Sequence, residues 1–328
     1  RAAMLFFCAQ LFTAAFSVAA YAMLEALTPH TRAIGENALY AISIMLPVAL
    51  FIGATFPLSV RILADNEMQA AAISGRVYMW NTVGAIVGAI LAGFYIIPGF
   101  GFTGAFKFAV AANVVLAGAA LALTARPRLY QFIAVAVVVA GLVLFYSPSR
   151  PDALIFANVK NERGAGRELF YAVGRSSTVL LRDVNGYFEL STDGLPESSI
   201  TRLGAAPARH SQMWLSALPA IARPQAKSML IIGLGGGMTV AAAPSNFERI
   251  DVVELEDQVV RANETIAALR AEDPLSDARV SIIENDARNA LLRSNGAYDI
   301  IVSQPSHPWT AGASHLYTRE FLLLAKRR

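Results

Sequence analysis

Long apolar runs fill the first 150 residues, and short polar or helix-breaking segments separate them. A bilayer span needs about 20 predominantly apolar residues. These runs are apolar on all sides, whereas the helices of a soluble core keep a polar outer face. The pattern therefore predicts membrane-spanning helices at Ala2–Leu27, Ala38–Val60, Val77–Ile97, Phe106–Leu123 and the shorter Tyr130–Tyr146.

The pattern changes after residue 150. Residues 151–167 are polar and indicate a linker. Between Leu169 and Leu195, short runs of strand-forming residues alternate with turn signals such as Asn185-Gly186, which predicts β-hairpins. A segment of helical composition, Ala208–Ile221, follows them.

After Lys227, strands alternate with helices, as in a parallel α/β sheet. The predicted strands are Ser228–Ile232, Arg249–Glu254, Val280–Ile283 and Tyr298–Ser303. The predicted helices begin near Met238 and cover Asp257–Arg270, Asp286–Arg293 and Leu316–Lys326.

Three regions are therefore expected. Residues 1–150 form a multi-helix transmembrane region, residues 151–225 a linker with a small β domain and a connecting helix, and residues 226–328 a Rossmann-like, methyltransferase-type domain. Four strands of the last sheet precede Arg328, and no initiator Met precedes Arg1. We interpret the sequence as a fragment of a longer protein whose last sheet is incomplete.

Charge follows the same division. The first 150 residues hold 8 Lys or Arg and 4 Asp or Glu, out of 27 and 24 in the whole chain. The pI near 9.1 thus reflects arginines in loops beside membrane spans, and no nucleic-acid partner is expected. The lone Cys8 excludes a disulfide framework and a Cys-based zinc site, and no metal is expected.

The segment Gly233-Leu-Gly-Gly-Gly237 lies between a predicted strand and a predicted helix. Its glycines Gly233, Gly235 and Gly237 permit a tight turn and close approach of a ligand at the helix start. Glu254 ends the next strand, where a carboxylate can accept both ribose hydroxyl protons, and Asn285-Asp286 follow the third strand, near an adenine edge. These strand ends predict a nucleoside site, and a cationic sulfonium nucleoside suits a cleft edged by Glu254 and Asp286.

Residues 228–321 resemble the aminopropyltransferase (spermidine synthase) family. The resemblance rests on residues 230–239, Asp251–Glu256, Asn285–Arg288, residues 298–303 and Leu316–Phe321. Residues 190–194 are similar to that family's small β domain. Upstream, Gly53–Pro57, residues 81–85 and residues 98–101 resemble the family's membrane-bound branch, in which a transporter-like helical region is fused to the synthase domain.

The resemblance implies transfer of an aminopropyl group from decarboxylated S-adenosylmethionine to putrescine or a similar amine. Three acidic positions of the family are replaced here: the catalytic aspartate by Gln304, a second acid by His307, and the donor-binding acid of the glycine-rich loop by Gly236. An amide accepts hydrogen bonds but takes no proton at neutral pH, whereas a histidine can. Asp193 and Tyr317 are the candidate substrate-binding residues, with Glu197 a further candidate amine contact.

Three functions stay open on these residues. The first is a membrane-anchored aminopropyltransferase, and the second is a non-catalytic, transporter-like membrane protein that binds a polyamine or nucleoside. The third is a methyltransferase that uses intact S-adenosylmethionine, because Gly236 does not repel a carboxylate. The expected partners are a small amine and the lipid bilayer, and the pattern leaves room for a homo-oligomer.

Two features of the sequence give opposite orientations in the membrane: the charges of the loops and the expected cofactor. If all five runs span, Arg61, Arg76 and Arg126 lie on the side opposite Arg32 and Arg150. The positive-inside rule then places residues 151–328 outside the cytoplasm. We expect an integral protein of a bacterial-type inner or plasma membrane. The expected cofactor indicates that residues 151–328 lie in the cytoplasm, although the charges of the loops argue the opposite.

Overall fold

A computed structural model of the chain describes residues 1–27, 34–64, 66–122, 166–184, 186–206, 211–294, 296–303 and 313–328. The chain divides into two compact units, residues 1–159 and residues 160–328.

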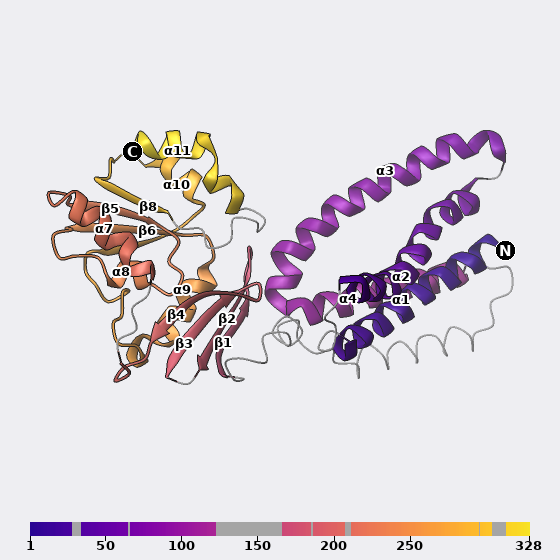
Figure 1. The fold of residues 1–328 in the computed structure, drawn as a ribbon. Coiled ribbons are helices and arrows are strands. Elements are labelled where there is room, and N and C mark those ends of the chain that lie inside the picture. The colour runs from indigo at the N-terminus through magenta and orange to yellow at the C-terminus, as the bar shows by residue number, and fades with distance from the viewer. Residues whose placement is uncertain are drawn as a thin grey trace. The chain divides into compact units, whose positions relative to one another are not determined.

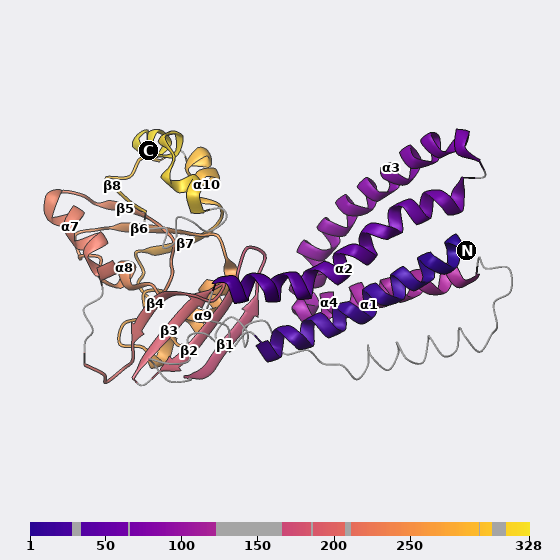
Figure 2. The same cartoon turned by 45° about the vertical axis from the view of Figure 1, so that its right-hand side comes forward.

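The described part of the first unit is helical (Figure 1). Its elements are α1 (Ala2–Leu27), α2 (Ile34–Leu63), α3 (Glu67–Leu91), a single π-helical turn η2 (Ala92–Ile96) and α4 (Ile97–Ala122). α1 packs against both α2 and α4, and these three helices run beside one another in Figure 2. Aromatic pairs lie at both contacts, with ring centroids 5.1 Å apart for Phe12 and Phe51 and for Tyr21 and Phe106.

The segment Pro98–Gly101, which separates the predicted spans Val77–Ile97 and Phe106–Leu123, contains a kink rather than a loop. Gly101 has a φ of 67°, which is outside helical geometry, while the helix continues on both sides. By length and composition alone, three helices are able to cross a membrane: Ala2–Met23, Ile34–Leu63 and the kinked segment Glu67–Ala122. The predicted span Tyr130–Tyr146 lies outside the described residues.

The second unit begins with an antiparallel sheet. Its strands are β1 (Arg167–Val173), β2 (Thr178–Val184), β3 (Tyr187–Thr192) and β4 (Leu195–Thr201), in the order β1-β2-β3-β4. Val179, Leu181, Phe188, Leu190 and Ile200 are fully buried and form the sheet's share of the core.

A parallel sheet follows, in the order β7-β6-β5-β8. Its strands are β5 (Ser228–Ile232), β6 (Arg249–Glu254), β7 (Val280–Glu284) and β8 (Ile300–Ser303). The helices of this unit are α7 (Trp214–Ala222), α8 (Met238–Ala241), α9 (Asp257–Thr265), α10 (Ala287–Arg293) and α11 (Arg319–Lys326).

Both faces of the parallel sheet are covered, which explains why its strands are continuous apolar runs. Met229 and Ile231 of β5 point into the core that includes Val240 and Val259. The alternating residues Leu230 and Ile232 point to the other face, against Leu291 of α10 and Phe321 of α11, both of which are fully buried.

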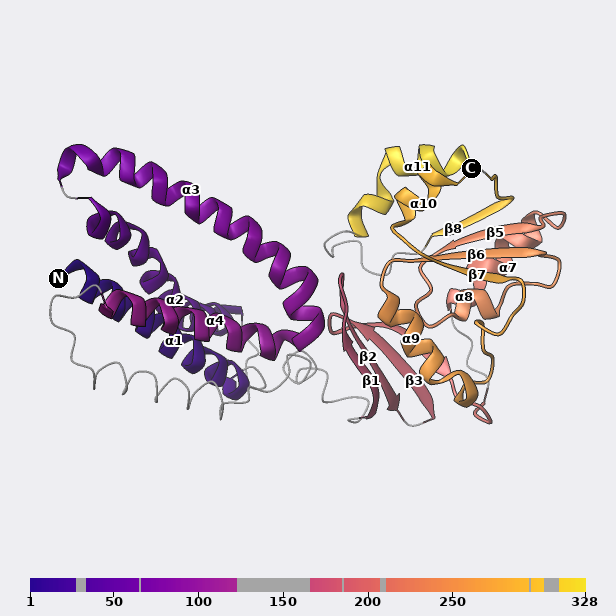
Figure 3. The same cartoon turned by 180° about the vertical axis from the view of Figure 1, so that it is seen from behind.

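α9 lies between the two sheets and packs on β1, β2 and β6 (Figure 3). Beyond it, a 3-10 turn η5 (Ala267–Leu269) continues into an extended bridge, in which Arg202 pairs with Arg270. The amide of Leu203 donates to the carbonyl of Leu269 at 2.8 Å, and the amide of Ala271 donates to the carbonyl of Thr201 at 3.0 Å. The β domain and the segment after α9 in the α/β domain therefore share backbone hydrogen bonds.

The predicted order of long apolar helices, an antiparallel β-sheet and a parallel α/β domain is confirmed. Several boundaries were wrong. The predicted helix Asp257–Arg270 ends at Thr265, because the following residues form the bridge to β4. Asp286 caps α10 instead of starting it, since its side chain accepts a hydrogen bond from the amide of Asn289. Leu316 lies in a 3-10 turn, η6 (Ala313–Tyr317), before α11.

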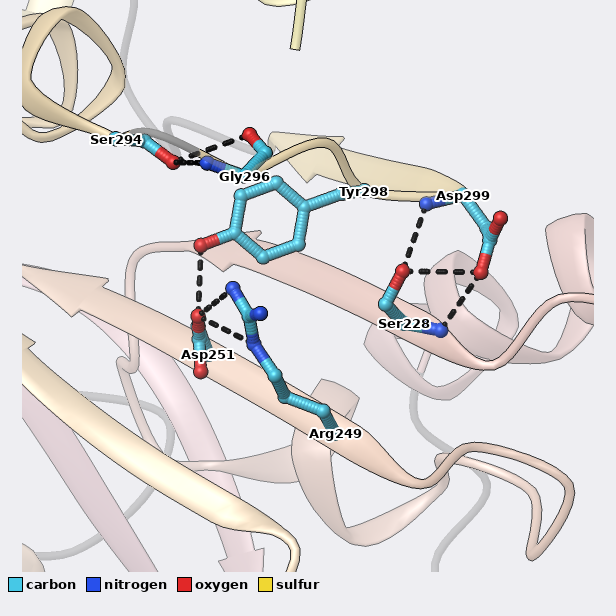
Figure 4. A network of polar contacts seen from close by, with 7 residues as sticks. All are labelled: Ser228, Arg249, Asp251, Ser294, Gly296, Tyr298 and Asp299. Carbon is cyan, nitrogen blue, oxygen red and sulfur yellow. Dashed lines mark hydrogen bonds and ion pairs between the residues drawn. The ribbon is translucent and has the colours of Figure 1, made fainter.

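A polar network fastens the amino-terminal ends of the parallel strands (Figure 4). The carboxylate of Asp251 accepts hydrogen bonds from the hydroxyl of Tyr298 at 2.7 Å and from the guanidinium of Arg249, which also lies over the tyrosine ring. Burial and the neighbouring Asp251 raise the pKa of Tyr298. Nearby, the amides of Lys227 and Ser228 donate to Asp299 and lower the pKa of that carboxyl.

We expect Tyr298→Phe to destabilise the parallel sheet by about 1–2 kcal/mol, since it removes one hydrogen bond to a buried carboxylate. Hydrogen exchange in the full chain measures the destabilisation: the amides of β6 and β8 should exchange faster in Tyr298→Phe than in the wild type. Tyr187→Phe is the matched control, because its half-buried ring sits in β3, far from Asp251 in the fold. Equal exchange in both variants would show that the network does not stabilise the sheet.

Candidate functional site

A cavity of about 660 Å³ lies where the parallel strands end at their carboxyl termini. Its walls come from the loops after β5, β6 and β7, from the turn between β1 and β2, and from the β3–β4 hairpin. The carboxyl edge of a parallel sheet is the usual place for a ligand in open α/β folds. The volume falls within the range of small-molecule sites, roughly 300–1,000 Å³.

The glycine-rich loop forms the floor of the cavity. Gly233, Gly235 and Gly237 have φ values of 92°, 50° and 73°, which favour glycine, as the sequence predicts for a tight turn. Gly233, Leu234, Gly235 and Gly236 line the cavity.

Two residues that the sequence analysis did not identify hold the loop from behind. Asn263 donates to the carbonyl of Gly235 at 2.8 Å, and Arg270 donates to the carbonyl of Gly236 at 2.7 Å and to Asn263 at 2.7 Å. Burial lowers the pKa of Arg270 to about 10, so the guanidinium remains charged at neutral pH. The one feature of the sequence that could have identified these two residues is the position of Asn263, a polar residue, on the apolar side of a predicted helix.

Glu254 reaches the same loop from the end of β6. One carboxylate oxygen accepts from the amide of Leu234 at 2.8 Å, and the other accepts from the amide of Glu256 at 3.0 Å. Burial raises the pKa of Glu254, and these amides act in the opposite direction. Glu254 therefore fastens the glycine-rich loop to the end of β6.

Glu256 connects the end of β6 to the turn between β1 and β2. Its carboxylate accepts from the amides of Ser176 and Ser177 at 2.9 and 3.1 Å and from the Ser176 hydroxyl at 2.8 Å. It also caps α9 through the amide of Gln258. Any side chain on Gly174 would collide with this carboxylate. Glu256 therefore fixes the turn that forms one wall of the cavity.

The remaining predicted residues are placed as follows. Asn285 and Asp286 line the cavity, where Asp286 caps α10 and Asn285 accepts from Asn289. Asp193 also lines it and accepts from the amide of Thr178 at 2.8 Å. Tyr317 is half exposed and is not part of the described wall. Gln304 and His307 lie outside the described residues.

The cavity is acidic. Its carboxylates are Asp193, Glu197, Glu254, Glu256 and Asp286, and the described part of the wall contains His315 but neither Lys nor Arg. Backbone amides and hydroxyls donate to these carboxylates and hold the side chains in place. The arrangement favours a cationic ligand. Within the described residues, no cluster of three or more His, Cys, Asp or Glu is arranged to hold a metal ion.

Gly236 lies directly under the β domain. A Cβ at this position would overlap the hydroxyl of Ser198 and would lie 2.7 Å from a side-chain carbon of Ile200. β4 thus occupies the space that a side chain on residue 236 would need, and the loop has no room for a carboxylate there.

Part of this unit is similar to known proteins. Residues 209–328 match the family described as the spermine/spermidine synthase domain. The chain is 27% identical over 301 residues to polyamine aminopropyltransferase 2 of Streptomyces coelicolor, which covers 87% of this chain and 52% of that protein. It is 32% identical over 106 residues to a polyamine aminopropyltransferase of Clostridium perfringens, covering 37% of that protein. The chain therefore spans about half, or less, of the length of these relatives.

Among solved structures, the chain is similar to a spermidine synthase in complex with the transition state analogue AdoDATO. The identity is 18% and the TM-score 0.41, with 49% of this chain and 54% of that chain covered.

We expect Glu256→Ala to release the turn between β1 and β2, because it removes the three hydrogen bonds from Ser176 and Ser177 that join this turn to the end of β6. Hydrogen exchange in the full chain measures the change at the amides of Ser176 and Ser177, which should lose protection by about tenfold or more. Glu248→Ala, an exposed carboxylate in the same unit, is the control and should leave these amides unchanged. Unchanged protection in Glu256→Ala would contradict this role.

Gly236→Ala should destabilise the second unit by about 1–3 kcal/mol, since the new methyl group overpacks the contact with β4. Denaturant unfolding of the full chain followed by tryptophan fluorescence provides the measurement. Gly296→Ala is the matched control, because the atom nearest to its added Cβ lies 3.8 Å away. Equal free energies of unfolding for Gly236→Ala and Gly296→Ala would show that β4 does not pack tightly against residue 236.

Proposed function

We propose that the chain is a membrane-anchored aminopropyltransferase that moves an aminopropyl group from decarboxylated S-adenosylmethionine to an amine acceptor. The observation that carries the proposal is the acidic cavity at the glycine-rich loop, whose described wall has five carboxylates and no Lys or Arg. Both proposed substrates are cations. The match of residues 209–328 to the spermine/spermidine synthase domain supports the same reaction.

The donor fits the residues that are present. In the proposed complex, the nucleoside lies on the loop of Gly233, Gly235 and Gly237, the ribose hydroxyls donate to Glu254, and the adenine edge meets Asn285 and Asp286. All of these residues line the cavity except Gly237, which begins α8 behind it.

The reaction needs a neutral amine held in line with the carbon beside the sulfonium. The amine nitrogen forms a bond to this carbon, the carbon–sulfur bond breaks, and its electron pair stays on the sulfur of uncharged methylthioadenosine. The amine also gives up one proton. Of the two candidates Gln304 and His307, only His307 is able to accept that proton near neutral pH.

The helices of the first unit supply the proposed membrane anchor. α2 and α3 have no buried residue among those described, and large apolar side chains such as Trp80, Leu50 and Phe94 are exposed. A lipid bilayer would cover these side chains. We place the second unit in the cytoplasm, where its proposed donor is made.

Two other functions give different results in the same experiment. Methyl transfer from intact S-adenosylmethionine is favoured by Gly236, because no carboxylate at this position repels the carboxylate of that donor. A binding protein without catalysis is favoured by Gln304, which replaces the expected aspartate.

The test uses the full chain in detergent micelles with decarboxylated and intact S-adenosylmethionine titrated in parallel, followed by incubation with putrescine. We expect tighter binding of the decarboxylated donor and release of methylthioadenosine. Glu254→Gln should weaken donor binding by about tenfold or more, since the amide replaces an acceptor oxygen with a donor group. Glu248→Gln, on the exposed surface, is the control.

Preference for intact S-adenosylmethionine would replace the proposal with methyl transfer. Donor binding without release of methylthioadenosine would replace it with a non-catalytic binding protein.

A further inference from the structure

Arg270 is a buried cation without an ion pair. The residue is 3% exposed, and Asp273 and Glu272 act on its guanidinium through their charge, with no salt bridge to it in the described part of the chain. Its Nε has no hydrogen-bond partner there either. An apolar side chain of similar volume often fills such a position at a lower cost in free energy. The stability of the fold alone therefore does not account for an arginine here.

The guanidinium is directed at the glycine-rich loop. One terminal nitrogen of Arg270 donates to the carbonyl of Gly236, and the other donates to the side-chain oxygen of Asn263, both at 2.7 Å. The side-chain nitrogen of Asn263 donates to the carbonyl of Gly235 at 2.8 Å and to that of Val259 at 2.9 Å. Arg270 and Asn263 together therefore hold two successive carbonyls of the loop.

The direction of these carbonyls sets the direction of the amides that follow them. The peptide bonds of the loop are trans, and in a trans peptide the N–H points opposite to the C=O. Because the Gly235 carbonyl points to Asn263 of α9, the Gly236 amide points away from α9. Among the described residues no group accepts this amide, whereas the Gly237 amide donates to the carbonyl of Leu234 at 2.8 Å. Gly236 lines the cavity, so its amide is left for a ligand.

The main chain that carries Arg270 is itself fixed on two sides. The amide of Arg270 donates to the carbonyl of Ile266, the residue after α9, at 3.1 Å. The next amide, that of Ala271, donates to the carbonyl of Thr201 in β4 at 3.0 Å. A side chain that starts from an anchored backbone is able to hold the peptide planes of the loop in one orientation.

We propose that Arg270, together with Asn263, is a positioning residue for the nucleoside that the glycine-rich loop binds. The pair holds the carbonyls of Gly235 and Gly236 turned toward α9 and so presents the Gly236 amide to an acceptor atom of the nucleoside. This inference rests on the proposed function, because that function places a nucleoside on this loop. Neither Arg270 nor Asn263 is part of the described cavity wall, so both act through the loop.

The test combines calorimetry with methylthioadenosine and NMR of the glycine amides, both on the full chain in detergent micelles. The variants are Arg270→Met, which removes the donors, and Arg270→Lys, whose single ammonium replaces the planar fork of donors. The matched control is Arg279→Met. Arg279 also donates to two backbone carbonyls of this unit, those of Pro244 and Phe247, and it is not part of the described cavity wall.

We expect Arg270→Met to bind methylthioadenosine about tenfold more weakly or worse, Arg270→Lys to recover part of this loss, and Arg279→Met to stay within about twofold of the wild type. At saturating methylthioadenosine, the Gly236 amide resonance should shift in the wild type and in Arg279→Met but not in Arg270→Met. An arginine that only supports the fold would not remove this shift.

Affinities within about twofold of the wild type in both Arg270 variants would overturn the positioning role, as would a Gly236 shift in Arg270→Met equal to that of the wild type. If Arg270→Met does not fold, Arg270→Lys decides by the same two readouts. A wild-type chain that fails to bind methylthioadenosine would overturn the proposed nucleoside site, and the role of Arg270 with it. Binding by the wild type and by both variants alike would overturn the role alone.

Discussion

Two carboxylates at the end of β6 hold together the parts of the molecule that form the cavity. Glu254 accepts the amide of Leu234 and so fixes the glycine-rich loop. Glu256, two residues later, accepts two amides and a hydroxyl from a turn 80 residues earlier in the chain. Both carboxylates lie at the end of β6, which is a buried inner strand between β5 and β7. The floor of the cavity and the turn between β1 and β2 are therefore both tied to one strand end.

The electrostatics of the cavity follow from how these carboxylates are held. Amides and hydroxyls satisfy a carboxylate by hydrogen bonding but leave its charge in place, whereas a salt bridge would neutralise it. The salt bridges among the described residues of this unit join other acids, such as Asp183, Asp251 and Asp277. The buried cation Arg270 faces the backbone of the loop instead of the cavity. The described wall therefore carries carboxylates but no Lys or Arg where a cationic substrate would bind.

The sequence predicted the features that depend on local pattern. The apolar runs, the alternation of strands and helices, and the strand-end position of Glu254 all follow from periodicity and spacing. Features that depend on distant contacts were missed. The attachment of Glu256 to Ser176 joins the two sheets, and Ser198 faces the cavity only because a bulge shifts the register of β4. The sequence of β4 alternates polar and apolar residues too weakly to reveal that bulge.

A structure of the full chain with methylthioadenosine bound tests the central claim most directly, because this nucleoside is the part that the proposed donor and product share. The account predicts the adenosine in the cavity, with the ribose hydroxyls within about 3.2 Å of the Glu254 carboxylate oxygens, which is hydrogen-bonding distance. The adenine is expected beside Asn285 and Asp286. A nucleoside bound elsewhere, or a cavity that stays empty at saturating ligand, would contradict it.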